Sequence, residues 1–253
     1  MREQFRAKDL PFSFFDAFDG THLDFRNHFT AIDFDTFRLN SYRSPAPGEI
    51  GCYASHLAIW NLAVYLDEPI VVLEDDCRLE NCFRDALRVA STLVESLGFI
   101  RIEGFRRSTR ALRLEPAYDR VLTVGDFGVH YLRDVPLCLL GYVISPAAAK
   151  KLVNASATLK SPVDKFIQRT WEHDVPIYAL SPSPVSKCET AGISTIGDRS
   201  QKHKDPITIF RRAIYKSTAE VRRAAYNRAH FRQLRKSDWQ LRIDIDRLAG
   251  FVE

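Results

Sequence analysis

Three consecutive carboxylates, Glu74, Asp75 and Asp76, directly follow a short apolar run at residues 69–73. A run of this length, rich in β-branched residues, predicts a central parallel strand covered on both faces, and ligands bind at the carboxyl ends of such strands. Neighbouring carboxylates repel one another, and a divalent cation relieves this repulsion because Mg²⁺ and Mn²⁺ prefer oxygen ligands. The junction therefore predicts a metal site, and the alternative interpretation is a solvated acidic loop.

The composition indicates a folded protein. The chain has 253 residues with 45% hydrophobic content, enough for one large domain or one domain with an appendage. Its five cysteines include no CxxC pair, which predicts neither a disulfide framework nor a zinc ribbon and fits a reducing compartment. The amino terminus is charged, and no uncharged stretch reaches the roughly 18 residues that cross a bilayer. We therefore expect neither export nor a membrane span.

The C-terminal part of the chain is basic. Residues 202–236 hold 11 Lys and Arg against two acids, a balance of +9, so the rest carries −5 of the total of +4. Within this part Phe210, Ile214, Val221 and Ala225 recur near helical spacing, and the arginines fall mostly elsewhere on the helical wheel. We predict one or two basic amphipathic helices. Three roles stay open: contact with an anionic membrane surface, a solvated face packed on its own domain, or nucleic-acid binding.

Strand and helix patterns alternate along the chain, which predicts an α/β fold. No glycine-rich phosphate loop occurs, so a bound nucleotide would be held through metal and side chains. The predicted strands are residues 12–18, 69–73, 99–102, 137–144 and 177–180, and the predicted helices are residues 53–66, 83–97, 146–152 and 164–173.

Several sequence blocks occur in a recognisable order: residues 48–57 with Trp60, 72–76, 141–145 with 149–152, 162–164 and 194–196. Together they closely resemble glycosyltransferase family 25, which includes bacterial lipopolysaccharide galactosyltransferases and animal procollagen galactosyltransferases. The resemblance implies an inverting, sugar-nucleotide-dependent transferase. The implied fold is α/β and GT-A-like (Rossmann-like), with a mixed, mostly parallel sheet flanked by helices. We expect this domain at residues 1–200 and a basic, amphipathic helical region at residues 201–253.

The same resemblance puts the three acids in the place of the family's metal-binding motif. Asp76 is then the direct ligand of Mn²⁺ or Mg²⁺, and Glu74 or Asp75 contacts the metal, its waters or the donor ribose. A cation bridging the phosphates of a UDP-sugar would stabilise the charge that develops on the leaving diphosphate.

Further residues of the matching blocks are candidates for the donor pocket or for proton transfer. Inverting displacement needs a general base, and Asp164 is the first candidate, with a helix N-cap as its alternative role. For Ser55 and His56 the alternative is a hydrogen-bonded place in the core. The donor-pocket candidates are Glu49, Ser55 and His56, the reserve bases are Glu103 and Asp126, and His203 is a candidate for a further metal ligand.

These observations lead us to expect a bacterial enzyme that is cytoplasmic and peripheral on the inner membrane through its basic tail. It would transfer a hexose, galactose from UDP-galactose by preference, to a lipooligosaccharide acceptor, and would not bind nucleic acid. The lack of a signal peptide and of a Lys-Asp-Glu-Leu-like end disfavours the animal branch. The competing hypothesis is a degenerate, non-catalytic GT-A domain serving as a membrane-associated or assembly protein. The absence of the first strand usual in the family favours this competitor, and the retention of all three acids disfavours it.

Overall fold

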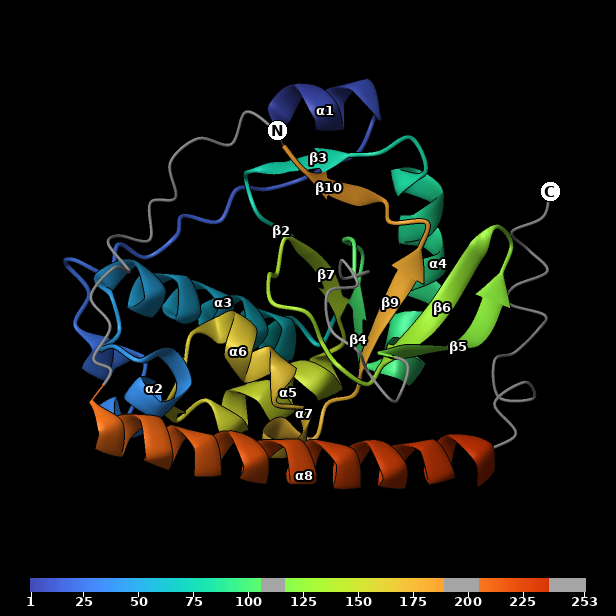
Figure 1. The fold of residues 1–253 in the computed structure, drawn as a ribbon. Helices are drawn as coiled ribbons and strands as arrows, with labels where there is room; N and C mark the ends of the chain where they lie inside the picture. Colours follow the sequence, from blue (N-terminus) through green and yellow to red (C-terminus); the bar gives the residue numbers. More distant parts are fainter. Residues whose placement is uncertain (106–116, 189–204, 237–253) are drawn as a thin grey trace.

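In a computed structural model of the chain, a six-stranded sheet has helices on both faces and one long helix lies along the edge of the body (Figure 1). The structure describes residues 1–105, 117–188 and 205–236. The strands of the sheet follow the order β2 (Ile70–Leu73), β7 (Gly141–Ile144), β4 (Phe99–Arg101), β9 (Ile177–Ser181), β6 (Phe127–Leu132) and β5 (Tyr118–Val124).

The expectation of a mostly parallel sheet is wrong for these strands. Only β4 and β9 pair in parallel; β7 runs antiparallel to both β2 and β4, and β6 runs antiparallel to β5 and β9. Among the described residues β2 is an edge strand bonded only to β7, and its Val71 is 38% exposed. The prediction of a central strand failed because a short apolar run does not reveal how many neighbours a strand has.

Two smaller, two-stranded sheets contain the other strands of the described residues. β1 (Ala31–Ile32) pairs in parallel with β8 (Thr158–Leu159), and β3 (Cys77–Leu79) pairs antiparallel with β10 (Val185–Lys187). The β3–β10 ribbon lies just beyond the end of β2 and near α1 (Figure 1).

The helices are α1 (Arg2–Ala7), α2 (Phe34–Ser41), α3 (Pro47–Leu66), α4 (Phe83–Leu97), α5 (Pro146–Ala155), α6 (Val163–Gln168), α7 (Thr170–His173) and α8 (Pro206–Lys236), with a 3₁₀ turn at Phe25–Asn27. The predicted helices at residues 53–66, 83–97 and 146–152 are confirmed. The segment 164–173 forms two short helices that meet at Arg169. The predicted strand at residues 12–18 is wrong, since this segment is irregular and its Phe12 ring stacks on Phe5 at 4.4 Å.

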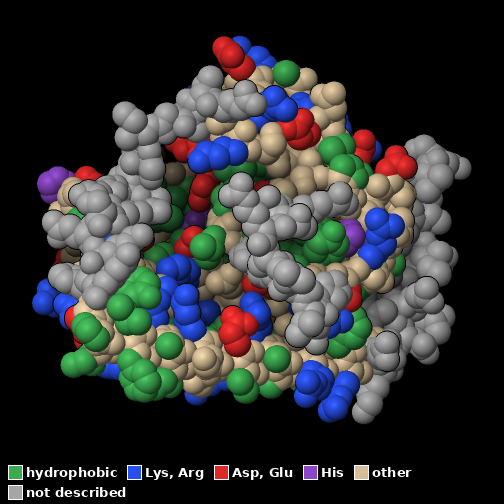
Figure 2. Space-filling view, in the orientation of Figure 1, with side chains coloured by type: hydrophobic (Ala, Val, Ile, Leu, Met, Phe, Trp, Pro, Cys, Tyr) green, Lys and Arg blue, Asp and Glu red, His purple; other side chains and the backbone are tan. Residues whose placement is uncertain are grey.

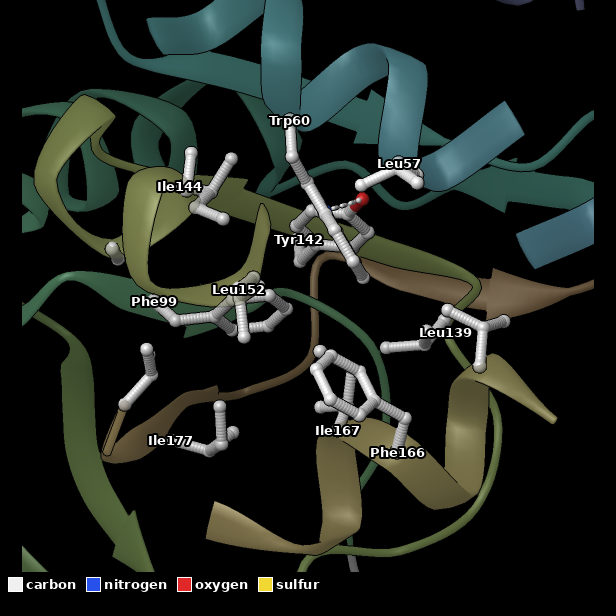
Figure 3. Close-up of a cluster of buried hydrophobic side chains, with 14 of the residues drawn as sticks. Leu57, Trp60, Phe99, Leu139, Tyr142, Ile144, Leu152, Phe166, Ile167 and Ile177 are labelled. Carbon is white, nitrogen blue, oxygen red and sulfur yellow. Dashed lines mark hydrogen bonds between the residues drawn. The ribbon is translucent and has the colours of Figure 1, made fainter. Parts of the chain in front are cut away.

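Alternating side chains of the central strands fill two separate cores, one on each face of the sheet. Phe99 and Ile177 pack with α3, α5 and α6 on one face, whereas Ile100 and Tyr178 pack with α4 on the other. Figure 3 shows the first core, where Trp60 of α3 lies over the ring of Tyr142 and its indole N–H donates to the Tyr142 hydroxyl at 3.0 Å. Successive side chains of each strand therefore point to opposite faces, as expected of a strand that is buried on both faces.

The helix ends follow the chemistry of their cap residues. Ser145 caps α5, where its hydroxyl accepts from the amide of Ala148, and Pro146 takes the first helical position. Gly98 ends α4 with φ +81°, a conformation that favours glycine. None of the described helices is both long enough and apolar enough to cross a membrane.

Candidate active site

The ends of β2 and β4 are joined through the backbone of one residue, Leu140. The amide of Glu74, which follows β2, donates to the Leu140 carbonyl at 2.9 Å. The Leu140 amide donates in turn to Oε2 of Glu103, two residues beyond β4, at 2.7 Å. Two of the predicted site carboxylates therefore lie at the same edge of the sheet, although β7 separates their strands.

Glu103 is 2% exposed and forms an ion pair with Arg101, which is itself fully buried. The Arg101 guanidinium also donates to the carbonyls of Pro136 and Cys138, each at 2.6 Å. Glu103 thus holds a buried cation that fixes the loop before β7. Arg101 was not among the residues predicted from the sequence, although its i, i+2 spacing from Glu103 along a strand puts both side chains on one face.

The Glu74 carboxyl is partly buried and lies near other acids. Its pKa is raised to about 7, chiefly by burial and then by the nearby charges of Asp76, Glu103, Asp75 and Asp164 in that order. Asp164 belongs to α6 and is therefore distant from Glu74 in the sequence. The structure therefore brings Asp76, Glu103 and Asp164 within electrostatic reach of Glu74.

A buried hydrogen-bonded chain runs from Trp60 through Tyr142 to His56, which lies beside Glu74. Nδ1 of His56 lies 2.9 Å from the Tyr142 hydroxyl, and its Nε2 lies 4.0 Å from Oε1 of Glu74. Burial lowers the pKa of His56 to about 4, so the ring is neutral. Because the Trp60 indole can only donate to Tyr142, the Tyr142 proton is available to His56 Nδ1, which leaves the imidazole proton on Nε2, facing Glu74. His56 is thus a hydrogen-bonded core residue that also faces the acids.

Asp76 is the acid of this cluster with a buried oxygen that lacks a hydrogen-bond partner among the described residues. Its Oδ1 is buried and has no hydrogen-bond partner among the described residues, while its Oδ2 lies 3.8 Å from Nζ of Lys187. Lys187 is brought there by the β3–β10 pairing, in which it lies opposite Cys77. An unpartnered carboxylate oxygen beside other acids is suited to a hard divalent cation.

The carboxylates present here fit a metal ion that is held by only one or two protein ligands. In the part of the chain that the structure describes, no group of three or more His, Cys, Asp or Glu side chains is arranged to hold a metal ion. Mg²⁺ and Mn²⁺ are commonly bound by one or two carboxylates with substrate phosphates and waters completing the shell. Asp76 and Glu74 meet that requirement, so the remaining ligands would come from a diphosphate and from water.

Asp164, Asp75 and Asp126 lie in three different environments. Asp164 is in the first turn of α6, whose N-cap is Pro162, so its proposed N-cap role is wrong. Its Oδ1 accepts from the Lys165 amide at 2.7 Å. Asp75 is exposed. Asp126 is exposed in the turn between β5 and β6, at the opposite edge of the sheet from β2.

Glu49 and Ser55, the candidates on α3 other than His56, both have structural roles. Glu49 is buried, forms an ion pair with Arg43 and accepts from the Ala46 amide at 3.0 Å. The Ser55 hydroxyl accepts from the Phe18 amide at 2.9 Å and so binds the irregular N-terminal segment. Both therefore have structural partners. His203 lies outside the described residues.

A cavity of about 370 Å³ is lined by Glu103 and by Lys187, the partner of Asp76, and its volume is within the usual range for small-molecule sites. In Figure 2 acidic side chains (red) and a histidine (purple) border a hollow near the middle of the view. Burial raises the pKa of the Cys138 thiol to about 12, so it stays protonated at neutral pH. The lining residues are Glu80, Glu103, Gly104, Cys138, Leu140, Ser183, Val185, Ser186 and Lys187.

Comparisons with known proteins give a consistent match. The sequence model of the family described as glycosyltransferase family 25 (LPS biosynthesis protein) matches residues 1–167, which include every acid of the cluster. A "glycosyltransferase 25 family member" of Drosophila melanogaster is 32% identical over 158 residues, covering 57% of this chain and 25% of the relative.

Two procollagen galactosyltransferases match over similar lengths. Procollagen galactosyltransferase 2 of Homo sapiens is 32% identical over 139 residues, covering 51% of this chain and 21% of the relative. Procollagen galactosyltransferase 1 of Danio rerio is 34% identical over 124 residues, covering 47% and 20%. The chain thus matches a quarter or less of the length of these three animal relatives.

We expect Tyr142→Phe to destabilise the fold by about 2–4 kcal/mol, because it leaves the Trp60 indole N–H and His56 Nδ1 buried without a partner. Urea unfolding measures this loss, and nitrogen chemical shifts of His56 report whether the imidazole proton leaves Nε2. The matched control is Tyr53→Phe, another buried hydroxyl, whose partner Ser156 keeps a bond to the Leu152 carbonyl, so its loss should be about 1 kcal/mol. Equal losses in both variants, with unchanged His56 shifts, would refute the proposed chain.

Glu74→Gln should stabilise the protein at pH 8 and have little effect at pH 5. The folded pKa of about 7 exceeds the ordinary 4.5, so the folded state holds an extra proton between these values and the wild type loses stability as pH rises through them. With the side chain 38% exposed, we expect a gain on the order of 1–2 kcal/mol at pH 8 without metal. Urea unfolding at both pH values, with exposed Asp126→Asn as control, tests this. A gain of the same size at pH 5 would contradict the assigned pKa.

Proposed function

This chain belongs to glycosyltransferase family 25, and we propose from that premise that it is an inverting hexosyltransferase that uses a UDP-sugar. We further propose that the sugar is galactose from UDP-galactose, since two of the relatives are named galactosyltransferases. The family description names LPS biosynthesis, which supports a lipopolysaccharide or lipooligosaccharide sugar as the acceptor. The observation that carries the proposal is the buried Asp76 Oδ1, which has no hydrogen-bond partner among the described residues and lies near the other acids at the end of β2.

Each residue of the cluster has a separate task in this reaction. Asp76, with Glu74 beside it, would hold Mn²⁺ or Mg²⁺, which when bound stabilises negative charge on the diphosphate. Lys187 lines the cavity 3.8 Å from Asp76 and offers a second positive charge to the phosphates. His56 would face the carboxylate of Glu74 with its Nε2 proton, since Nε2 lies 4.0 Å from Oε1 of Glu74. The Glu103–Arg101 pair fixes the loop that forms one wall.

The geometry supports Asp164 as the general base over the two reserve candidates. The Glu103 carboxylate is already bound by Arg101 and by the Leu140 amide. Asp126 lies at the opposite edge of the sheet. Asp164 is half-buried and acts electrostatically on Glu74, so it lies near the place where the donor would sit. As a carboxylate it could accept the proton of the acceptor hydroxyl during displacement.

Asp76→Asn should abolish metal-dependent donor binding while leaving the fold intact. Calorimetric titration of UDP-galactose and UDP-glucose, with Mn²⁺ and with EDTA, should show binding by the wild type only with Mn²⁺. We expect at least about 100-fold weaker binding in the variant, since it loses the anionic ligand. Asp126→Asn is the matched control and should bind as the wild type does. Unchanged binding by Asp76→Asn would refute the metal assignment, and no binding by the folded wild type would favour a non-catalytic domain.

Asp164→Asn should lower kcat by about 10²–10⁴-fold, the usual contribution of a general base, with little change in donor KM. The variant should also lose the acidic limb of the pH–rate profile. Galactose transfer to a truncated lipooligosaccharide, followed from pH 5 to 9, gives both quantities. A pH profile and kcat equal to those of the wild type would exclude Asp164 as the base.

A further inference from the structure

The long helix α8 packs on the body through polar side chains. Asn227 accepts a hydrogen bond from the Tyr131 hydroxyl at 2.7 Å, and Arg223 donates to Asp134 at 2.8 Å. The same side of the helix makes further polar and ring contacts to the body through Arg212, Tyr215 and His230. The inner face of α8 is therefore mainly polar and aromatic, unlike the apolar face with which a helix usually covers a core.

The apolar side chains of α8 point away from the body. Ile207, Phe210, Ile214 and Val221 are 71%, 67%, 53% and 69% exposed. Their spacings of three, four and seven residues put them on one face of the helix. The sequence-based alternative of a helix with a solvated face packed on its own domain agrees with the packing of α8, but the packed side is the polar one and Phe210, Ile214 and Val221 are on the solvated side. We call these four residues the outer stripe.

Basic side chains surround the outer stripe. Arg211, Arg222, Arg228 and Arg232 are exposed, and none of them forms an ion pair with another residue that the structure describes. The one acid within α8, Glu220, pairs with Arg223. Figure 2 shows hydrophobic (green) and basic (blue) side chains together along the lower edge of the molecule, where Figure 1 places α8.

We propose that the outer stripe and its basic flanks bind an anionic lipid surface, with α8 lying in the plane of the membrane interface. An apolar stripe flanked by arginines matches the acyl boundary and the negative headgroups of such a surface at the same time. The helix is about 46 Å long, so its contacts spread along the surface.

A second copy of this chain fits the same face less well. Two facing copies would bring their arginines together, and like charges placed opposite each other oppose association. The four side chains of the outer stripe also offer less area than the roughly 800 Å² that each partner of a stable dimer buries.

Co-sedimentation with lipid vesicles tests the proposal on the full chain. The wild type should bind vesicles of phosphatidylcholine with about 30 mol% phosphatidylglycerol, bind pure phosphatidylcholine vesicles far less, and be released by about 0.5 M NaCl. Replacing Phe210, Ile214 and Val221 by Ser should weaken binding at least about tenfold. Replacing Arg211, Arg222 and Arg228 by Gln should weaken it about fivefold for each arginine removed.

The matched control replaces Arg6, Arg26 and Arg88, three exposed arginines on other elements, by Gln. It changes net charge by the same amount and should bind vesicles as the wild type does. Three results would overturn the proposal: no binding of the wild type to anionic vesicles, an equal loss in the control, or a wild-type dimer in light scattering that the Ser variant converts to monomer without any vesicle binding. The inference does not rest on the proposed transfer reaction, because titration with UDP-galactose reports on the Asp76 site separately.

Discussion

The central constraint on this structure is the crowding of carboxylates at one edge of the sheet. Glu103 is compensated within the fold by Arg101 and by the Leu140 amide. Glu74 is compensated only in part, and its pKa rises to about 7 under burial and neighbouring negative charge. Asp76 keeps one buried oxygen without a partner among the described residues. Such an arrangement costs stability unless something positive binds there, and functional sites commonly hold this kind of uncompensated charge.

The surrounding elements can be understood as the frame that keeps these acids together. Leu140 ties the end of β2 to Glu103, and Arg101 ties Glu103 to the loop before β7. On the other side of Glu74, His56 lies 4.0 Å from the carboxylate and is hydrogen-bonded to Tyr142. Tyr142 in turn accepts from Trp60 in the larger core (Figure 3). A rigid frame of this kind is what a site needs if a donor is to bind in one geometry.

The sequence predicted the local features of this site and missed its long-range ones. The acids after an apolar strand and the capped helix after Ser145 follow from short-range rules, and both are present. The antiparallel β7 beside β2 was not predictable, because strand order depends on contacts between distant residues. The same limit explains why Asp126 lies at the far edge of the sheet, and why the wheel of α8 did not tell which of its faces would point outward.

The central claim is that Asp76 and Glu74 hold a divalent cation for a sugar-nucleotide donor, and anomalous diffraction tests it most directly. Crystals grown with MnCl₂ and UDP would be measured on both sides of the manganese absorption edge. Our account predicts a single manganese peak within coordination distance of the Asp76 carboxylate, bridged to the diphosphate, and no such peak in crystals of Asp76→Asn. A bound UDP with no manganese at Asp76, or a peak that persists in the variant, would contradict it.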